Sequence, residues 1–319
     1  MTQAQIPVTV FSGFLGSGKT TIITHVIDEL QQQGIQVVFI KNEIGSENID
    51  ATLMKGKHIE TKELLNGCIC CTLVGPFIQA IDEIALTLHP DRIIIEASGA
   101  ADPAAIALMI DSQPRLMRDG VLCVIDVSNF EGYSDLSQTA KNQTRFTDLL
   151  VFNKVELVDL DRKRAVVGYV RELNDHAPVV EAPGGILPAA IACGISTTEL
   201  TKLLKDITLE KQDTDHHHDH LAVDGITSFH VSLTQTIDTA KLQKVLEQAP
   251  HSIYRIKGIV HSTDGHYHMI NKVGNRTTLL PAPDDFQVAS ESIVCIGFNI
   301  MEYQATITQA ITSCYVSLT

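Results

Sequence analysis

The chain has 319 residues, of which 44% are hydrophobic. At ~100–200 residues per domain, this length predicts two domains, each with a buried core. Lysine and arginine number 24 against 38 aspartate and glutamate, so the net charge of −14 disfavours nucleic acid and anionic membrane surfaces as partners. The start of the chain, MTQAQIPVTVF, lacks the basic and apolar segments of a secretory signal, and we expect a cytoplasmic protein.

Short runs rich in valine and isoleucine alternate with helix-like segments through the first part of the chain. These runs predict strands at 7–13, 35–42, 91–98, 120–127, 148–154 and 177–182, and helices that start near Lys19, Leu73 and Pro103. Strands that are apolar on both faces and separated by helices are typical of βαβ crossovers. Residues 1–208 are therefore predicted to form a doubly wound α/β domain with a mostly parallel sheet.

The composition changes after residue 208. Residues 209–224 are polar, and they include the tract DHHHDH, which either collects transition metals weakly or serves as a solvated linker. Strands are predicted at 226–233, 252–260, 266–271 and 292–300, and helices near 239–249 and from about Met301. This order predicts a smaller α+β domain over 225–319, with two helices on one face of an antiparallel sheet.

The segment GFLGSGKT, residues 13–20, matches the pattern G-x-x-x-x-G-K-[ST] of a P-loop between a predicted strand and a predicted helix. Glycines let backbone N–H groups converge on phosphate oxygens, and the helix N-terminus adds positive charge. We expect Lys19 to reach the β and γ phosphates and the Thr20 hydroxyl to ligate Mg²⁺. The residues expected to contact nucleotide here are Gly13, Gly16, Ser17, Gly18, Lys19, Thr20 and Thr21.

A carboxylate is expected near this Mg²⁺ ion, at the end of a neighbouring buried strand. Glu96 ends the run RIIIE and is the candidate, acting on the ion directly or through water. The alternative is a solvated residue at a strand boundary. Three residues later, Gly99 is placed to offer a backbone N–H to the γ-phosphate. Lys19, Thr20 and Glu96 are therefore the candidate catalytic residues.

Another strand ends in NKVE, which resembles the N-K-x-D motif with which GTPases bind guanine. A carboxylate at its last position accepts hydrogen bonds from guanine, whereas adenine presents an acceptor there. The residues expected at the base are Asn153, Lys154 and Glu156, with glutamate in place of aspartate; Asp159 is a second carboxylate, better placed to begin the next helix. An ordinary strand end is the alternative interpretation.

Three cysteines stand together in GCICC, at Cys68, Cys70 and Cys71. Positions two apart in an extended segment point to the same side, and three thiolates suit Zn²⁺ or Co²⁺ with a fourth position left open. Buried core cysteines and a redox pair are the alternatives. Cys123 and Cys295 lie in apolar runs instead and are predicted to be core residues.

The P-loop, the segment NEIG that contains Glu43, Glu96 and NKVE all follow predicted strands. Because the carboxyl ends of parallel strands meet at one edge of a sheet, we expect these groups to gather there. The segment from Glu43 to Cys71 lies between two such strand ends and is interpreted as a switch loop that the γ-phosphate orders. Glu43 is a further candidate metal ligand.

Together these residues resemble the CobW family of P-loop GTPases, which are similar to metallochaperones. The motifs that carry the resemblance are GFLGSGKTT, NEIG, GCICC, EASG and NKVE, and the later YRIKGIV is similar to the second domain of the family. The resemblance covers nearly the whole chain.

The resemblance implies hydrolysis of GTP, with Mg²⁺, linked to delivery of a transition metal that the three cysteines hold. It also implies a client metalloprotein, with a nucleotide-dependent homodimer as a further expectation. We expect zinc as cargo, with cobalt as the alternative, and slow intrinsic turnover because no arginine finger is evident. A small-molecule kinase and a nucleotide-gated metal buffer without turnover are the other functions considered.

Overall fold

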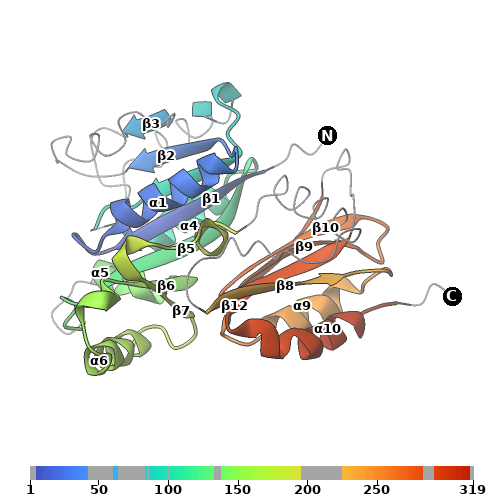
Figure 1. The fold of residues 1–319 in the computed structure, drawn as a ribbon. Helices are drawn as coiled ribbons and strands as arrows, with labels where there is room; N and C mark the ends of the chain where they lie inside the picture. Colours follow the sequence, from blue (N-terminus) through green and yellow to red (C-terminus); the bar gives the residue numbers. More distant parts are fainter. Residues whose placement is uncertain are drawn as a thin grey trace. The chain divides into compact units, whose positions relative to one another are not determined.

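A computed structural model describes residues 5–41, 60–63, 83–84, 86–99, 101–132, 138–194, 225–282 and 291–316. The chain divides into two compact units, one over Gln5–Ala192 and one that begins at Cys193 (Figure 1). No helix in the described ranges is long and apolar enough to cross a membrane.

The first unit contains a seven-stranded sheet in the order β3-β2-β4-β1-β5-β6-β7. All six neighbouring pairs are parallel, so the strands end at a common edge. This arrangement confirms the predicted parallel α/β fold. The strands are β1 (Ile6–Gly13), β2 (Val37–Lys41), β3 (Glu60–Glu63), β4 (Arg92–Glu96), β5 (Leu116–Asp126), β6 (Leu149–Asn153) and β7 (Val179–Ala182).

The strands inside this sheet are largely buried, as continuous apolar runs require. All five residues of β4 and of β6 are buried. Hydrophobic side chains of β1, β4 and β5 pack with those of the helix that follows β4 in one core cluster. The described helices are α1 (Lys19–Gln32), α4 (Pro103–Asp111), α5 (Gln138–Arg145), α6 (Leu160–Arg171) and α7 (Ala189–Ala192), with short 3₁₀ turns η1 (Val155–Leu157) and η2 (Pro183–Gly185).

Two helices of the first unit begin at aspartates that cap them. The Asp102 carboxylate accepts a hydrogen bond from the Ala104 N–H at 2.9 Å, and the Asp159 carboxylate accepts one from the Arg162 N–H at 2.8 Å. The expectation that Asp159 begins a helix is therefore confirmed.

The structure adds elements that the sequence patterns did not predict. Strand β3 lies inside the segment interpreted as a switch loop, and it pairs with β2 at the edge of the sheet. Its sequence, ETKE, has no apolar residue, and the sequence of α5, QTAKNQTR, is almost as polar. The predicted helix start near Leu73 lies outside the described residues.

The second unit contains a five-stranded antiparallel sheet in the order β11-β10-β9-β12-β8. Residues of α9 and α10 pack with Ile256 and Cys295 of the sheet in one core, which confirms the predicted α+β unit (Figure 1). Strand β11 was not predicted, and a 3₁₀ turn precedes the last helix. The elements are β8 (Ile226–Ser232), α9 (Thr239–Glu247), β9 (Ile253–His261), β10 (Tyr267–Val273), β11 (Arg276–Pro281), β12 (Ser292–Phe298), η3 (Ile300–Tyr303) and α10 (Gln304–Thr312).

Candidate nucleotide site

The P-loop joins β1 to α1 at the carboxyl edge of the first sheet. Three of its glycines have positive φ angles: 133° at Gly13, 75° at Gly16 and 95° at Gly18. A Cβ at Gly13 would overlap the Val124 carbonyl of β5, and a Cβ at Gly18 would overlap the Asn153 amide. Only glycine therefore lets the loop lie this close to the neighbouring strands.

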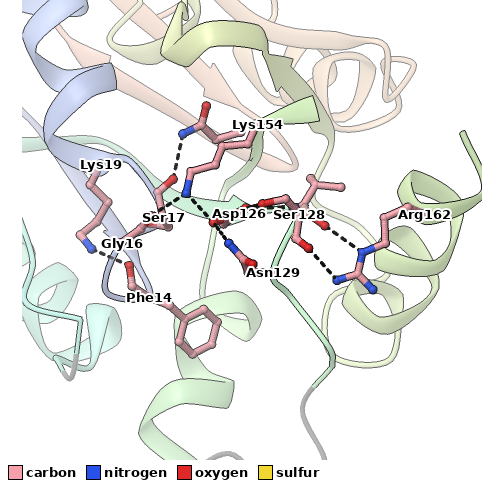
Figure 2. Close-up of polar contacts among 11 residues, drawn as sticks. Phe14, Gly16, Ser17, Lys19, Asp126, Ser128, Asn129, Lys154 and Arg162 are labelled. Atoms are coloured by element: carbon pink, nitrogen blue, oxygen red, sulfur yellow. Dashed lines mark hydrogen bonds and ion pairs between the residues drawn. The ribbon is translucent and has the colours of Figure 1, made fainter. Parts of the chain in front are cut away.

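Lys19 is 6% exposed, and its ammonium group lies within the P-loop. The Lys19 Nζ donates hydrogen bonds to the carbonyl oxygens of Gly13 at 2.9 Å and Phe14 at 3.0 Å. Figure 2 shows the side chain turned back towards Phe14. The loop therefore carries a positive charge where the P-loop pattern places phosphate oxygens.

Thr20 and Glu96 meet across two elements of the first unit. The Thr20 hydroxyl lies 2.9 Å from Glu96 Oε1 and 3.0 Å from Oε2, and the Glu96 side chain is buried at the end of β4. A hydroxyl beside a carboxylate is the all-oxygen donor set that Mg²⁺ prefers. These two residues therefore fit the cation that accompanies a triphosphate.

Asn153 connects the end of β6 to the P-loop. Its amide nitrogen donates to the Ser17 carbonyl at 2.8 Å, which fixes the loop against the strand. The Asn153 Oδ1 and the Ser17 Oγ are both buried without a hydrogen-bond partner among the described residues. Two such polar atoms beside one glycine-rich loop fit a polar ligand, because a buried polar group without a partner is costly.

Lys154 lies over the P-loop rather than pointing away from it. Its backbone is left-handed, with φ of 59°, which is uncommon for lysine. The Lys154 Nζ lies 2.6 Å from Asp126 Oδ2 and donates to the Gly16 carbonyl at 3.2 Å (Figure 2). Glu156, in contrast, is an exposed residue of η1.

Asp126 was missed by the sequence analysis. Burial alone raises the pKa of its carboxyl, but hydrogen bonds from Lys154, Ser128 and Asn129 outweigh burial and lower the pKa to about 2. The residue ends β5 next to Asn153 of β6, with which it is in register. Its position at a strand end, as for Glu96 and Asn153, is the signal by which it could have been found.

The loop that follows Asp126 is held by α6. Arg162 donates from Nε to the Val127 carbonyl at 3.0 Å and from a terminal nitrogen to the Phe130 carbonyl at 2.6 Å. The ring of Phe130 packs on that of Phe14 in the P-loop, with centroids 5.8 Å apart. These contacts hold the loop directly after Asp126 between α6 and the P-loop.

Two further segments approach the site. Gly185, in the turn after β7, lies against α1, since a Cβ there would be 2.9 Å from the Thr21 Cγ2, and its carbonyl oxygen is 2.9 Å from His25 Nδ1. A Cβ at Gly99 would lie 3.0 Å from the Leu15 nitrogen, so the loop after β4 also contacts the P-loop. The turn after β7 was not predicted to reach the site.

The predicted metal ligands Glu43, Cys68, Cys70 and Cys71 lie outside the described residues. Across the described ranges, no group of three or more His, Cys, Asp or Glu side chains is arranged to hold a metal ion. The cysteines that the structure does describe, Cys123, Cys193, Cys295 and Cys314, are buried. Burial raises the pKa of Cys123 and of Cys295 to about 12, so these two are core thiols, as predicted.

A parallel α/β sheet with a P-loop at its carboxyl edge defines a P-loop nucleotide-binding protein. Residues 7–181 match the family described as CobW/HypB/UreG, nucleotide-binding domain, and residues 226–315 match the cobalamin synthesis protein cobW C-terminal domain. The chain therefore belongs to the CobW family, and the resemblance drawn from its sequence motifs is confirmed.

Three relatives are named as zinc chaperones. The zinc chaperone CobW of Sinorhizobium sp. is 30% identical over 295 residues, which cover 80% of this chain and 81% of the relative. The zinc chaperone CobW of Pseudomonas aeruginosa is 30% identical over 300 residues, which cover 81% of this chain and 77% of the relative. The zinc chaperone YjiA of Escherichia coli is 26% identical over 271 residues, which cover 80% of this chain and 81% of the relative.

Proposed function

We propose that this protein is a GTP-hydrolysing zinc chaperone, in which nucleotide at the P-loop controls a Zn²⁺ ion carried as cargo. The observation that supports the proposal best is the P-loop site itself, where Lys19, the Thr20–Glu96 pair and the Asn153–Lys154 segment meet at one sheet edge. The names of the relatives support zinc as the cargo, and cobalt is the alternative.

The phosphates of GTP would lie on the P-loop, with its backbone N–H groups as donors. The Lys19 ammonium, now held by two loop carbonyls, would exchange them for phosphate oxygens. Thr20 and Glu96 would hold Mg²⁺, which neutralises charge on the triphosphate. These groups position and stabilise charge without a strong general base or an arginine finger, so we expect slow turnover.

At the other end of the nucleotide, Asn153 and Lys154 would hold the base against the loop. The Asn153 Oδ1, which has no hydrogen-bond partner in the described ranges, would supply an acceptor, and Lys154 is held by Asp126. Glu156 is exposed two residues after Lys154 and would accept hydrogen bonds from guanine, which favours GTP over ATP.

The cargo site would be made by Cys68, Cys70 and Cys71, with Glu43 as a further candidate ligand. Three thiolates leave one position of a tetrahedral Zn²⁺ site open, so a client metalloprotein can complete the coordination and take the ion. We propose the boundaries 1–208 for the GTPase domain, 209–224 for the histidine-rich linker and 225–319 for the C-terminal domain, and a homodimer that forms with bound nucleotide.

Metal binding by the reduced full chain tests the cargo site. Titration with Co²⁺, monitored by the thiolate-to-metal charge-transfer absorption band, should show one tight site. The variant with Cys68→Ser, Cys70→Ser and Cys71→Ser should lose this band. Cys193→Ser is the matched control, because it removes a buried thiol and should leave the band unchanged. A band that survives in the triple variant would contradict the proposed ligands.

Nucleotide turnover is tested separately with the same protein. GTP should be hydrolysed in the presence of Mg²⁺, and Lys19→Ala should abolish hydrolysis while the Co²⁺ band remains. Transfer of phosphate to an added small molecule, without release of free phosphate, would instead indicate a kinase.

A further inference from the structure

Gln143 lies on α5 and is fully buried, at 0% exposure. Its amide nitrogen donates to the Gly99 carbonyl at 2.7 Å and, at a longer 3.4 Å, approaches the Ala101 carbonyl. Both acceptors belong to the loop between β4 and α4. Because the amide faces two carbonyl oxygens, its nitrogen and not its oxygen must point towards them.

The other half of this amide has no partner. Gln143 Oε1 is buried without a hydrogen-bond donor among the described residues. A buried acceptor without a donor costs free energy, and an apolar side chain of similar size would avoid that cost. What glutamine contributes at this position must therefore come from its two N–H donors.

Those donors hold a loop that makes two contacts near the nucleotide site, one with Thr20 and one with Leu15 of the P-loop. The loop begins at Glu96, which accepts the hydrogen bond from Thr20, and continues to Gly99, which packs against the Leu15 nitrogen. Beyond Ala101, the Asp102 carboxylate caps α4 and accepts a hydrogen bond from Asn142 at 2.8 Å. On α5, Asn142 thus contacts the cap of α4, whereas Gln143 contacts the loop before that cap.

We propose that Gln143 is a positioning residue that holds Gly99 against the P-loop, so that this loop responds to the terminal phosphate of a nucleoside triphosphate. The inference rests on the proposed GTPase function. The terminal phosphate is the part of GTP that GDP lacks, and a contact that only GTP makes can change only the affinity for GTP and the rate of hydrolysis. A merely structural glutamine would change the affinities for GDP and GTP alike.

The test compares the affinities of the full chain for GDP and for the non-hydrolysable analogue GMPPNP, both with Mg²⁺, by calorimetry. Gln143→Met keeps the size of the side chain and removes its donors. We expect Q143M to weaken GMPPNP binding about tenfold, the size of one lost buried hydrogen bond, and to leave GDP binding unchanged. The kcat for GTP should fall by a similar factor.

Asn142→Ala is the matched control, because it removes the neighbouring bond from α5 to Asp102 and should leave the ratio of the two affinities as in the wild type. Equal losses of GDP and GMPPNP affinity in Q143M, or no loss, would overturn the inference while the proposed function stands. A wild-type chain that binds neither nucleotide would overturn the proposed function itself. If Q143M does not fold, Gln143→Asn replaces it, because its amide is one methylene too short to reach Gly99. The same ratio of GMPPNP to GDP affinity is then compared with that of the wild type.

Discussion

Replacing Asp126 by asparagine removes the charge that anchors Lys154 and keeps the shape of the side chain. The pKa of Asp126 is about 2 where its ordinary value is 3.8. At 1.36 kcal/mol per pKa unit, the ionised carboxylate contributes about 2 kcal/mol to the free energy of unfolding at neutral pH. We expect Asp126→Asn to lose this amount, because its side chain is only 13% exposed and solvent screens the ion pair weakly.

The pH dependence of this loss follows from the sign of the shift. Because the folded pKa lies below the unfolded one, the contribution is present above pH 3.8 and is lost as the pH falls towards 2. The variant lacks it at every pH. The difference between wild-type and variant free energies of unfolding, measured in guanidinium chloride, should therefore be constant from pH 7 to pH 5 and narrow below pH 4.

The same variant should bind GTP about tenfold more weakly, since Lys154 would keep only its bond to the Gly16 carbonyl. Titration with a fluorescent guanine nucleotide measures this affinity. Asp111→Asn is the control, because Asp111 pairs with Arg118 at 3.2 Å while 42% exposed, and should cost less than about 0.5 kcal/mol with no change in affinity. A D126N protein that unfolds like D111N, or that loses stability and still binds GTP as the wild type does, would refute the positioning of Lys154 by Asp126.

Two further predictions concern a glycine and a buried lysine. Gly18→Ala should abolish nucleotide binding, because a Cβ there overlaps the Asn153 amide, whereas Gly34→Ala, with φ of 80° and open space around the Cβ, should bind GTP normally; equal affinities would contradict the role of Gly18. Burial lowers the pKa of Lys272, 1% exposed in the second unit, from 10.5 to about 8. Lys272→Met should therefore be more stable than the wild type by up to about 3 kcal/mol below pH 8. This difference in the free energy of unfolding, measured by chemical denaturation, should disappear as the pH rises to 10.5. A difference that does not change with pH would contradict a buried charged amine.

The sequence predicted the parts of this structure that local chemistry determines. Strands β1, β4 and β6 are runs of apolar residues on both faces, and the P-loop pattern places its glycines where the backbone needs positive φ. Strands β3 and β11 were missed because an edge strand needs no apolar face and forms through the neighbour with which it pairs.

The candidate site was predicted only where a motif marks it. Asp126 and Gln143 belong to no motif, and their roles depend on contacts with Lys154 and Gly99, which are distant in sequence. The strand-end position of Asp126 marks it as close to the site but does not show which residue it contacts, and a glutamine on a polar helix gives no local signal at all. The cysteine motif is the reverse case, since its chemistry is explicit in the sequence while Cys68, Cys70 and Cys71 lie outside the described residues.

The coupling of nucleotide state to cargo is the central claim, and the Zn²⁺ affinity of the full chain tests it most directly. Competition with a chromogenic chelator would give this affinity with GDP and Mg²⁺ and again with GMPPNP and Mg²⁺. We predict affinities that differ by about tenfold or more, a difference that Lys19→Ala removes without loss of the metal site. Equal Zn²⁺ affinities in the two nucleotide states of the wild-type protein would contradict a GTP-controlled zinc chaperone.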